Sequence, residues 1–197
     1  MTTTDTPTPR SIRMRNSVLA AAAATAGLAV PAAADAHVTV NPRSVTAGSF
    51  DVMNVRVPNE RDNKGTVKVD VRFPDGFYFL SYKKVPGWKV KITRETLPAP
   101  VDLEGLSITQ QISRVVWTGN PKKGGVIRPS QFEEFPISVR VPDGEAGSQL
   151  MFRAIQTYRG GEKVRWTAAD PAADTPAPRV TLAAPAAAAL AKRTGGA

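Results

Sequence analysis

The sequence contains no cysteine and only one histidine, His37, among its 197 residues. Without thiols the chain has no disulfide framework, no thiolate metal site and no cysteine nucleophile. A serine-based catalytic apparatus would have to use His37 itself as its base. These absences argue against an enzyme, and they leave few side chains that could bind a metal ion.

Long apolar runs are also missing. The longest, residues 18–30, is shorter than the roughly 20 residues that a membrane-spanning helix needs. Three arginines precede this run, and the small-x-small sequence Ala-Asp-Ala follows it at 34–36. This order is typical of a secretory signal peptide. We therefore expect residues 1–36 to be cleaved on export, leaving a soluble protein in the periplasm or elsewhere at the cell envelope.

Basic residues outnumber acidic ones, 26 to 17, for a net charge of +9. Residues 37–197 keep a net +8, because three arginines and two aspartates precede His37. An exported chain rarely meets nucleic acid, and these lysines and arginines are scattered through strand-like segments. The charge therefore predicts solvated strand faces near an anionic envelope and no nucleic-acid partner.

From His37 onward, apolar and polar residues alternate with the period of two that is typical of strands. Glycine- and proline-rich turns separate the alternating segments, and no helical period of useful length appears. The segments are 37–40, 51–58, 66–74, 88–95, 113–118, 135–142, 150–158 and 163–167. Seven or more short strands predict an all-β fold, an antiparallel β-sandwich of the immunoglobulin or fibronectin kind.

The composition changes near Asp170. Residues 171–197 are rich in alanine and proline, so we expect at most one terminal strand there, followed by a flexible tail. The sandwich domain is therefore predicted to span residues 37–170.

Cleavage after Ala36 would give His37 both a free α-amine and an imidazole. Together these two nitrogens can close a six-membered chelate ring on one metal ion, which an internal histidine cannot do because its backbone nitrogen is an amide. Nitrogen donors in a tetragonal arrangement suit Cu(II). The alternative is that His37 is simply the first residue of a strand.

One chelating residue leaves coordination positions open. Glu133 and Glu134 lie between Phe132 and Phe135 at the start of an otherwise apolar strand. A carboxylate in such a strand is costly to bury unless a cation meets it. The alternative is a pair of solvent-facing acids at a strand end.

Six motifs, taken together and in order, resemble the YcnI-type family of bacterial envelope proteins. They are "AHVTVNP", "RVPNE", "FPDGF", "VPGWKV", "QFEEFPISVRVP" and "AIQTYRGGEKVRW", and they extend from His37 to Trp166. The resemblance implies an immunoglobulin-like or fibronectin-like sandwich that binds Cu(II) through a mono-histidine brace. In that brace a processed N-terminal histidine supplies amine and imidazole, a glutamate of the "EF" motif supplies an oxygen, and a tryptophan lies near the metal.

Matched to this sequence, the resemblance implies His37 as the bidentate ligand and Trp166 as the nearby indole. Glu134 is implied as the carboxylate ligand because it directly precedes Phe135. Strand parity keeps Glu133 open as the alternative, since Glu133 shares a face with Phe135 and the apolar residues that follow. For the other tryptophans, Trp88 and Trp117, we expect only a packing role.

These observations predict an exported Cu(II)-binding protein that handles or carries copper and is not an enzyme. The resemblance implies that its partners are other envelope copper chaperones or copper-transporting membrane proteins. The competing interpretation is a structural or adhesive β-sandwich module without a metal.

Overall fold

The computed structural model describes residues 1–3 and 37–185. The fold described below belongs to the unit Asp35–Ala197. The signal peptide predicted for residues 1–36 falls almost entirely outside the described residues. Within the described ranges no helix is long and apolar enough to cross a membrane.

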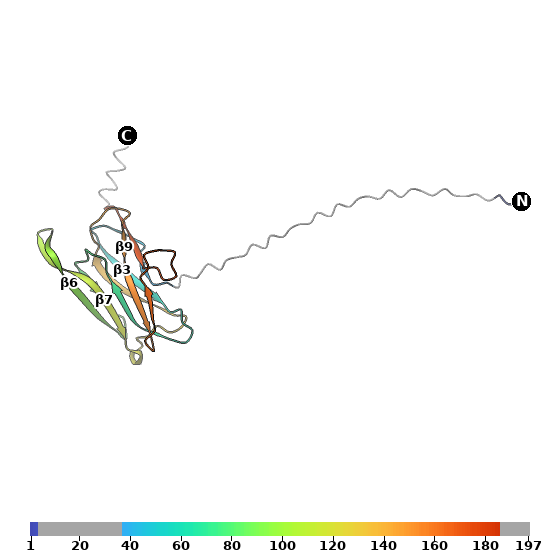
Figure 1. Ribbon diagram of the computed structural model, residues 1–197, viewed down its shortest axis with the longest axis horizontal. Coiled ribbons are helices and arrows are strands. Elements are labelled where there is room, and N and C mark those ends of the chain that lie inside the picture. Colours follow the sequence, from blue (N-terminus) through green and yellow to red (C-terminus); the bar gives the residue numbers. More distant parts are fainter. Residues whose placement is uncertain (4–36, 186–197) are drawn as a thin grey trace, which may run out of the picture. The chain divides into compact units, whose positions relative to one another are not determined.

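Strands make up the described domain, together with one short 3-10 helix (Figure 1). The elements in chain order are β1 Thr39–Asn41, β2 Ser44–Thr46, β3 Phe50–Pro58, β4 Thr66–Arg72, β5 Leu80–Tyr82, β6 Trp88–Leu103, β7 Leu106–Gly119, η1 Pro121–Lys123, β8 Phe132–Arg140, β9 Gln149–Met151, β10 Arg153–Tyr158, β11 Lys163–Trp166 and β12 Arg179–Ala183.

Three sheets arise from these strands. A four-stranded sheet has the order β1-β3-β8-β5, a five-stranded sheet has the order β11-β10-β4-β7-β6, and a small sheet has the order β2-β12-β9. Every strand pair is antiparallel except β12 with β2. The predicted all-β antiparallel class is therefore confirmed.

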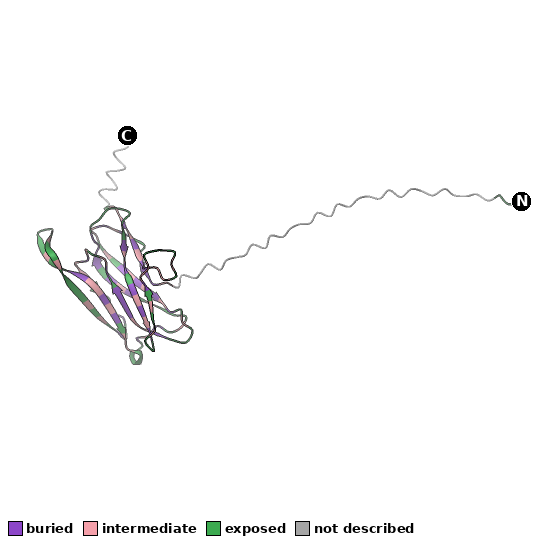
Figure 2. Cartoon of the chain, viewed as in Figure 1, coloured by how far each residue is buried: buried purple, intermediate pink, exposed green. Residues whose placement is uncertain are grey.

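The predicted alternation places the core correctly. On β3, Met53, Val55 and Val57 are buried, and on β4, Val69 and Val71 are buried. On β3 the residues between them are less buried, which gives a banded burial pattern (Figure 2), whereas on β4 Asp70 is buried on the outer face, where it accepts hydrogen bonds from Arg114. A one-residue shift of register would turn these valines to solvent, so burial fixes the pairing.

Aromatic contacts join the two larger sheets. Phe135 on β8 lies between Trp88 on β6 and Trp117 on β7, with ring centroids 5.0 and 5.1 Å away. All three side chains are buried, and Phe135 and Trp117 have no exposed surface. The packing role predicted for Trp88 and Trp117 is thus confirmed.

The domain extends beyond the boundary predicted at residue 170. Strand β12 pairs with β2 and β9, and its Val180 and Leu182 are buried. The alanine- and proline-rich composition concealed this short alternation, in which Val180 and Leu182 point inward between less buried neighbours. The flexible tail predicted after it would begin later than residue 171, and residues 186–197 lie outside the described part.

The β6–β7 hairpin is longer than the sequence analysis predicted, and its outer half extends beyond the neighbouring strands (Figure 1). Its turn uses Glu104 and Gly105, both with positive φ, which is the backbone geometry of the tight two-residue hairpin turn. The far half of the hairpin is largely exposed (Figure 2).

Candidate metal centre

His37 lies two residues before β1, at the edge of the four-stranded sheet, and is half-buried. Its ring lies 5.2 Å, centroid to centroid, from the ring of Trp166, with the two planes tilted by 51°. Trp166 ends β11, the edge strand of the five-stranded sheet. The single imidazole of the chain and a buried indole thus meet where two sheet edges come together.

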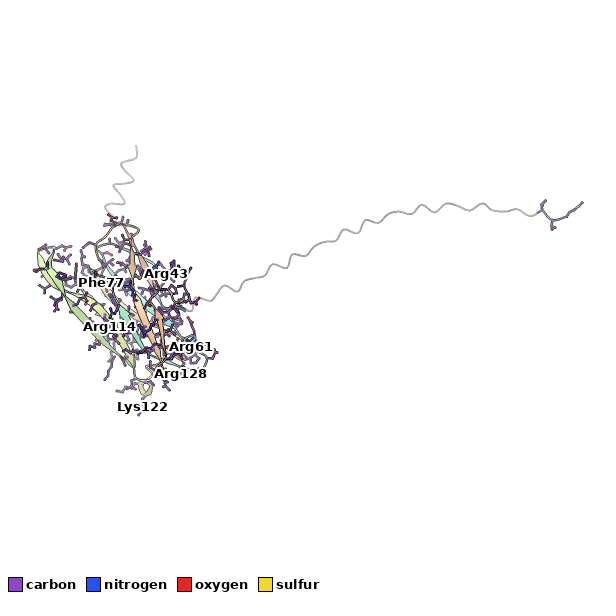
Figure 3. All side chains as sticks on the ribbon, viewed as in Figure 1. Arg43, Arg61, Phe77, Arg114, Lys122 and Arg128 are labelled. Carbon is purple, nitrogen blue, oxygen red and sulfur yellow. The ribbon has the colours of Figure 1, made fainter. Side chains whose placement is uncertain are left out.

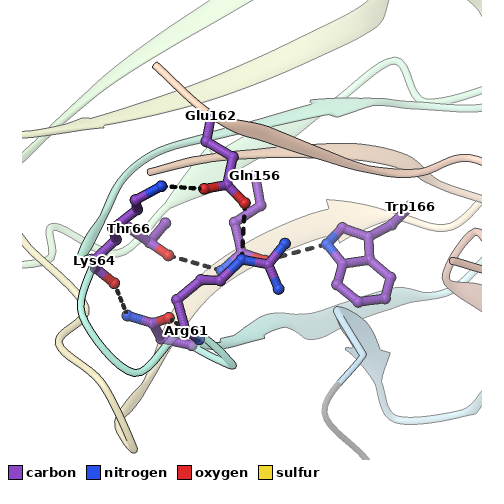
Figure 4. A network of polar contacts seen from close by, with 7 residues as sticks. Arg61, Lys64, Thr66, Gln156, Glu162 and Trp166 are labelled. Carbon is purple, nitrogen blue, oxygen red and sulfur yellow. Dashed lines mark hydrogen bonds and ion pairs between the residues drawn. The ribbon is translucent and has the colours of Figure 1, made fainter. Parts of the chain in front are cut away.

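A buried amide holds the indole in place (Figure 4). Trp166 Nε1 donates to Gln156 Oε1 at 3.1 Å. The Nε2 group of Gln156 in turn donates to the carbonyl oxygen of Pro58 and to Thr66 Oγ1, both at 2.8 Å. Because the indole N–H is already used, Trp166 can offer a neighbouring metal only its ring, and Gln156 fixes where that ring lies.

The segment that follows β3 is also tightly fixed. Asn59 is buried, and its Nδ2 group donates to the carbonyl oxygens of Lys64 and Ile127, both at 2.8 Å. Its Oδ1 atom accepts from the backbone N–H of Arg61 at 2.9 Å. These bonds, with the bond that Pro58 accepts, hold the backbone on both sides of Glu60. The "RVPNE" motif therefore builds a rigid support for one exposed carboxylate.

Glu60 lies within electrostatic reach of His37. Desolvation by the surrounding protein raises the pKa of the Glu60 carboxyl above its usual 4.5, while the charges of His37 and Arg61 act in the opposite direction. A partly desolvated carboxylate beside an imidazole is a suitable donor set for a cation. Sequence reasoning quoted this motif but did not select Glu60. The available signal was only an acid shortly after a strand, since the pairing of that strand with β1 is seen first in the structure.

A neighbouring carboxylate, that of Glu162, is already engaged. Its two oxygens accept from Arg61 Nε at 2.8 Å and from Lys64 Nζ at 2.7 Å (Figure 4). Hydrogen bonds from Lys64 and Arg61 lower the pKa of Glu162. This exposed cluster ties the loop after β3 to the β10–β11 turn.

The two glutamates expected from the "EF" motif lie elsewhere. Glu134 is exposed on β8, in register with Arg56 of β3, which is itself in register with Thr39 of β1. Two strand spacings put Glu134 about 10 Å from β1. Glu133 is half-buried opposite Val57. The register therefore separates both acids from β1 by a whole strand, whereas Glu60 follows β3, the direct neighbour of β1.

His37 also borders a depression of about 230 Å³. Its other walls come from β1, Arg43 and the segment before β12, and the lining residues are Val38, Thr39, Arg43, Pro171, Pro176, Ala177, Pro178 and Arg179. This side of His37 is thus open, which would leave room for an exchangeable ligand or a partner.

No group of three or more His, Cys, Asp or Glu side chains suited to a metal occurs in the part of the chain that the structure describes. A metal held near His37 would therefore need a third protein donor that is not one of these side chains. The α-amine of His37 would meet this need, but that nitrogen is an amide as long as residue 36 is attached. The donor set fits a metal only after processing.

Comparison with known proteins decides the family. A family model described as "Domain of unknown function (DUF1775)" matches residues 37–182, about three quarters of the chain. The chain belongs to the DUF1775 family. The match runs through β12, in agreement with the domain boundary seen in the structure.

Two relatives are informative. The copper-binding protein CutI of Bacillus subtilis is 32% identical over 145 residues, which cover 74% of this chain and 61% of CutI. The crystal structure of an uncharacterized protein from Nocardia farcinica, described as immunoglobulin-like, matches with a TM-score of 0.57 and 28% identity. That match covers 75% of this chain and 98% of the other. These findings confirm the resemblance to the YcnI-type family and the immunoglobulin-like fold of this DUF1775 domain.

Replacing Gln156 by leucine should destabilise the DUF1775 domain by about 1–3 kcal/mol, because buried partners of the amide lose their hydrogen bonds. Urea unfolding followed by circular dichroism measures this free energy. Gln149→Leu is the matched control, since Gln149 is exposed and bonds only to Thr181 Oγ1. Equal stability of the two variants would mean that the amide does not hold the indole.

Proposed function

We propose that the processed protein binds Cu(II) through the α-amine and imidazole of His37 and the carboxylate of Glu60, with the ring of Trp166 against the site. The observation that carries this proposal is the packing of the only histidine against the ring of Trp166, beside an open depression and with the carboxylate of Glu60 within electrostatic range. The family relationship to CutI, a copper-binding protein, supports copper as the metal.

The chemistry of these donors favours Cu(II). The amine nitrogen and ring Nδ1 of one residue form a six-membered chelate, and a carboxylate oxygen adds an anionic donor. Two nitrogens and an oxygen in a flat arrangement suit Cu(II), which also binds such donors more strongly than other divalent ions of its row. Glu134, expected from the "EF" motif, is the competing oxygen ligand.

Copper handling suits this site better than catalysis. The chain has no second histidine to complete a two-imidazole copper centre. Soft donors that retain Cu(I) are also scarce. After residue 36 the sequence has two methionines: Met53 is buried in the core, and Met151 lies on β9, far from Met53 in the sequence. Reduction would therefore loosen the metal and provide a release step.

We infer that the protein is exported and works at the cell envelope, where it exchanges copper with other copper chaperones or with copper-transporting membrane proteins. Export also supplies the peptidase that creates the amine of His37. The second candidate function is a metal-free structural or adhesive module, which the immunoglobulin-like fold would equally support.

Electron paramagnetic resonance distinguishes the two candidates. The chain that begins at His37, mixed with one equivalent of Cu(II), should give a tetragonal spectrum with nitrogen hyperfine structure, and His37→Ala should abolish it. Trp166→Phe is the control, because it keeps every proposed donor. If the native protein leaves the spectrum of free Cu(II) unchanged, the metal-free module is favoured.

The oxygen ligand can be assigned by two matched substitutions. Glu60→Gln should weaken Cu(II) binding by at least about tenfold, because it removes an anionic donor of the same size. Glu134→Gln removes the same charge two strands from β1 and should leave the affinity unchanged. Competition with a chromophoric chelator measures both. The reverse result would restore Glu134 as the ligand and reject Glu60.

A further inference from the structure

The topology gathers basic residues that are dispersed in the sequence onto one surface. On the five-stranded sheet, the paired positions that point away from the core form three cross-strand rows, which together we term the basic face. The rows are Lys163–Thr157–Lys68–Thr118–Lys89, Arg165–Ile155–Asp70–Val116–Lys91 and Arg153–Arg72–Arg114–Thr93. Eight of these residues are basic and Asp70 is the one acid among them.

This face accounts for almost all of the charge excess of the protein. Its paired positions carry a net +7, while residues 37–197 as a whole carry +8. The lysines and arginines elsewhere are thus nearly balanced by acids. The basic composition is therefore a property of one sheet surface, and it is not spread evenly over the molecule.

The third row is the densest part of the basic face. Arg153, Arg72 and Arg114 stand directly opposite one another on β10, β4 and β7. Like charges in directly opposed positions repel and destabilise a sheet. Arg114, labelled in Figure 3, lies on β7. Such an arrangement costs stability unless an anion offsets the repulsion.

The acids nearby offset only part of this charge. Asp70 accepts two hydrogen bonds from the guanidinium of Arg114 and lies 3.8 Å from Lys68 Nζ. Glu95, at the border of the row, accepts from Gln111 Nε2 at 2.8 Å. Within residues 37–185, neither Arg72 nor Arg153 forms an ion pair or a side-chain hydrogen bond, and both are exposed.

Two shallow depressions flank these arginines. One, of about 350 Å³, lies between the row and the base of the β6–β7 hairpin, and the other, of about 320 Å³, lies towards β11. Arg72, Arg114 and Arg153 line both. A guanidinium fork matches the oxygens of a phosphate group, so each depression offers arginine donors to one phosphate.

We propose that the basic face docks the protein on the phosphate headgroups of an anionic phospholipid surface. The face is about 20 Å wide across its five strands, so it presents its charges to an extended array of phosphates. None of the paired positions is aromatic, which disfavours base stacking on single-stranded nucleic acid and insertion into the lipid core. Each basic residue near an anionic bilayer strengthens binding by about fivefold.

The basic face and the candidate metal centre are neighbours but do not overlap. Arg165 points outward from β11, whereas the next residue, Trp166, points inward to His37. Docking would therefore hold the metal centre at the rim of the bound face, near the bilayer and still open. This inference does not depend on copper binding and is tested without it.

The test uses residues 37–197, which contain every described strand and belong to one compact unit. Sedimentation with vesicles of phosphatidylcholine and about 30% phosphatidylglycerol measures binding, and pure phosphatidylcholine vesicles give the baseline. We expect binding to the anionic vesicles only, weakening strongly as salt is raised. Arg72→Gln with Arg153→Gln should weaken this binding by about 30-fold.

Lys83→Gln with Lys84→Gln is the matched control. It removes the same number of exposed charges beside the four-stranded sheet, and it should change vesicle binding by less than about threefold. The thermal unfolding temperature of the arginine variant should be unchanged or raised, because the substitution relieves repulsion. This result separates docking from a structural role of the arginines.

Four results would overturn the proposal. The first is equal sedimentation of the protein with neutral vesicles, and the second is an equal loss of binding in both double variants, which would reduce the effect to net charge. The third is displacement from the vesicles by millimolar inorganic phosphate, which would assign the basic face to a soluble phosphate. The fourth is binding of a single-stranded oligonucleotide that is equally tight and equally sensitive to the arginine substitutions, which would assign the face to another polyanion.

Discussion

The side-chain amide of Gln156 connects the parts on which the candidate metal centre depends. It is fully buried on β10, and its three hydrogen bonds reach the end of β3, the start of β4 and the indole at the end of β11. A buried amide is stable only when its groups are paired, so each partner constrains the others. The position of Trp166 beside His37 and the start of the loop that carries Glu60 are consequently fixed by one side chain.

Scarcity of donors shapes the proposed chemistry. The described domain holds one imidazole, no thiol and no cluster of three suitable side chains. The protein would thus have a metal site only where a cleavage event adds a nitrogen to the one histidine. Binding would then be coupled to export, because the uncleaved chain lacks the amine. Such a site would be open where His37 borders the depression that Arg43 also lines, which suits transfer of the metal to a partner.

The sequence predicted the parts of the fold that follow from local alternation. The buried valines of β3 and β4 and the packing of Trp88 and Trp117 needed only strand parity and residue type. Strand β12 was harder, because two inward-pointing residues in a segment rich in alanine and proline give a weak pattern. Local patterns therefore identified the sandwich, and they allowed one terminal strand but left it outside the predicted domain.

What depends on register could not be predicted. Glu60 comes within electrostatic range of His37 because β1 pairs with β3 and because Asn59 closes the following loop. The "EF" motif instead directed attention to Glu134, on the strand beyond. The basic face has the same origin, since Arg72 and Arg153 are far apart in the sequence and become neighbours only through the pairing of β4 with β10. Pairing partners are set by the whole core, and no single segment encodes them.

The most direct test of the account is the Cu(II) affinity of two chains that differ by one residue, one beginning at His37 and one retaining Ala36. The account predicts that the extra residue weakens binding by at least about a hundredfold, because it converts the amine into an amide while leaving imidazole, Glu60 and Trp166 in place. Equal affinities would contradict it.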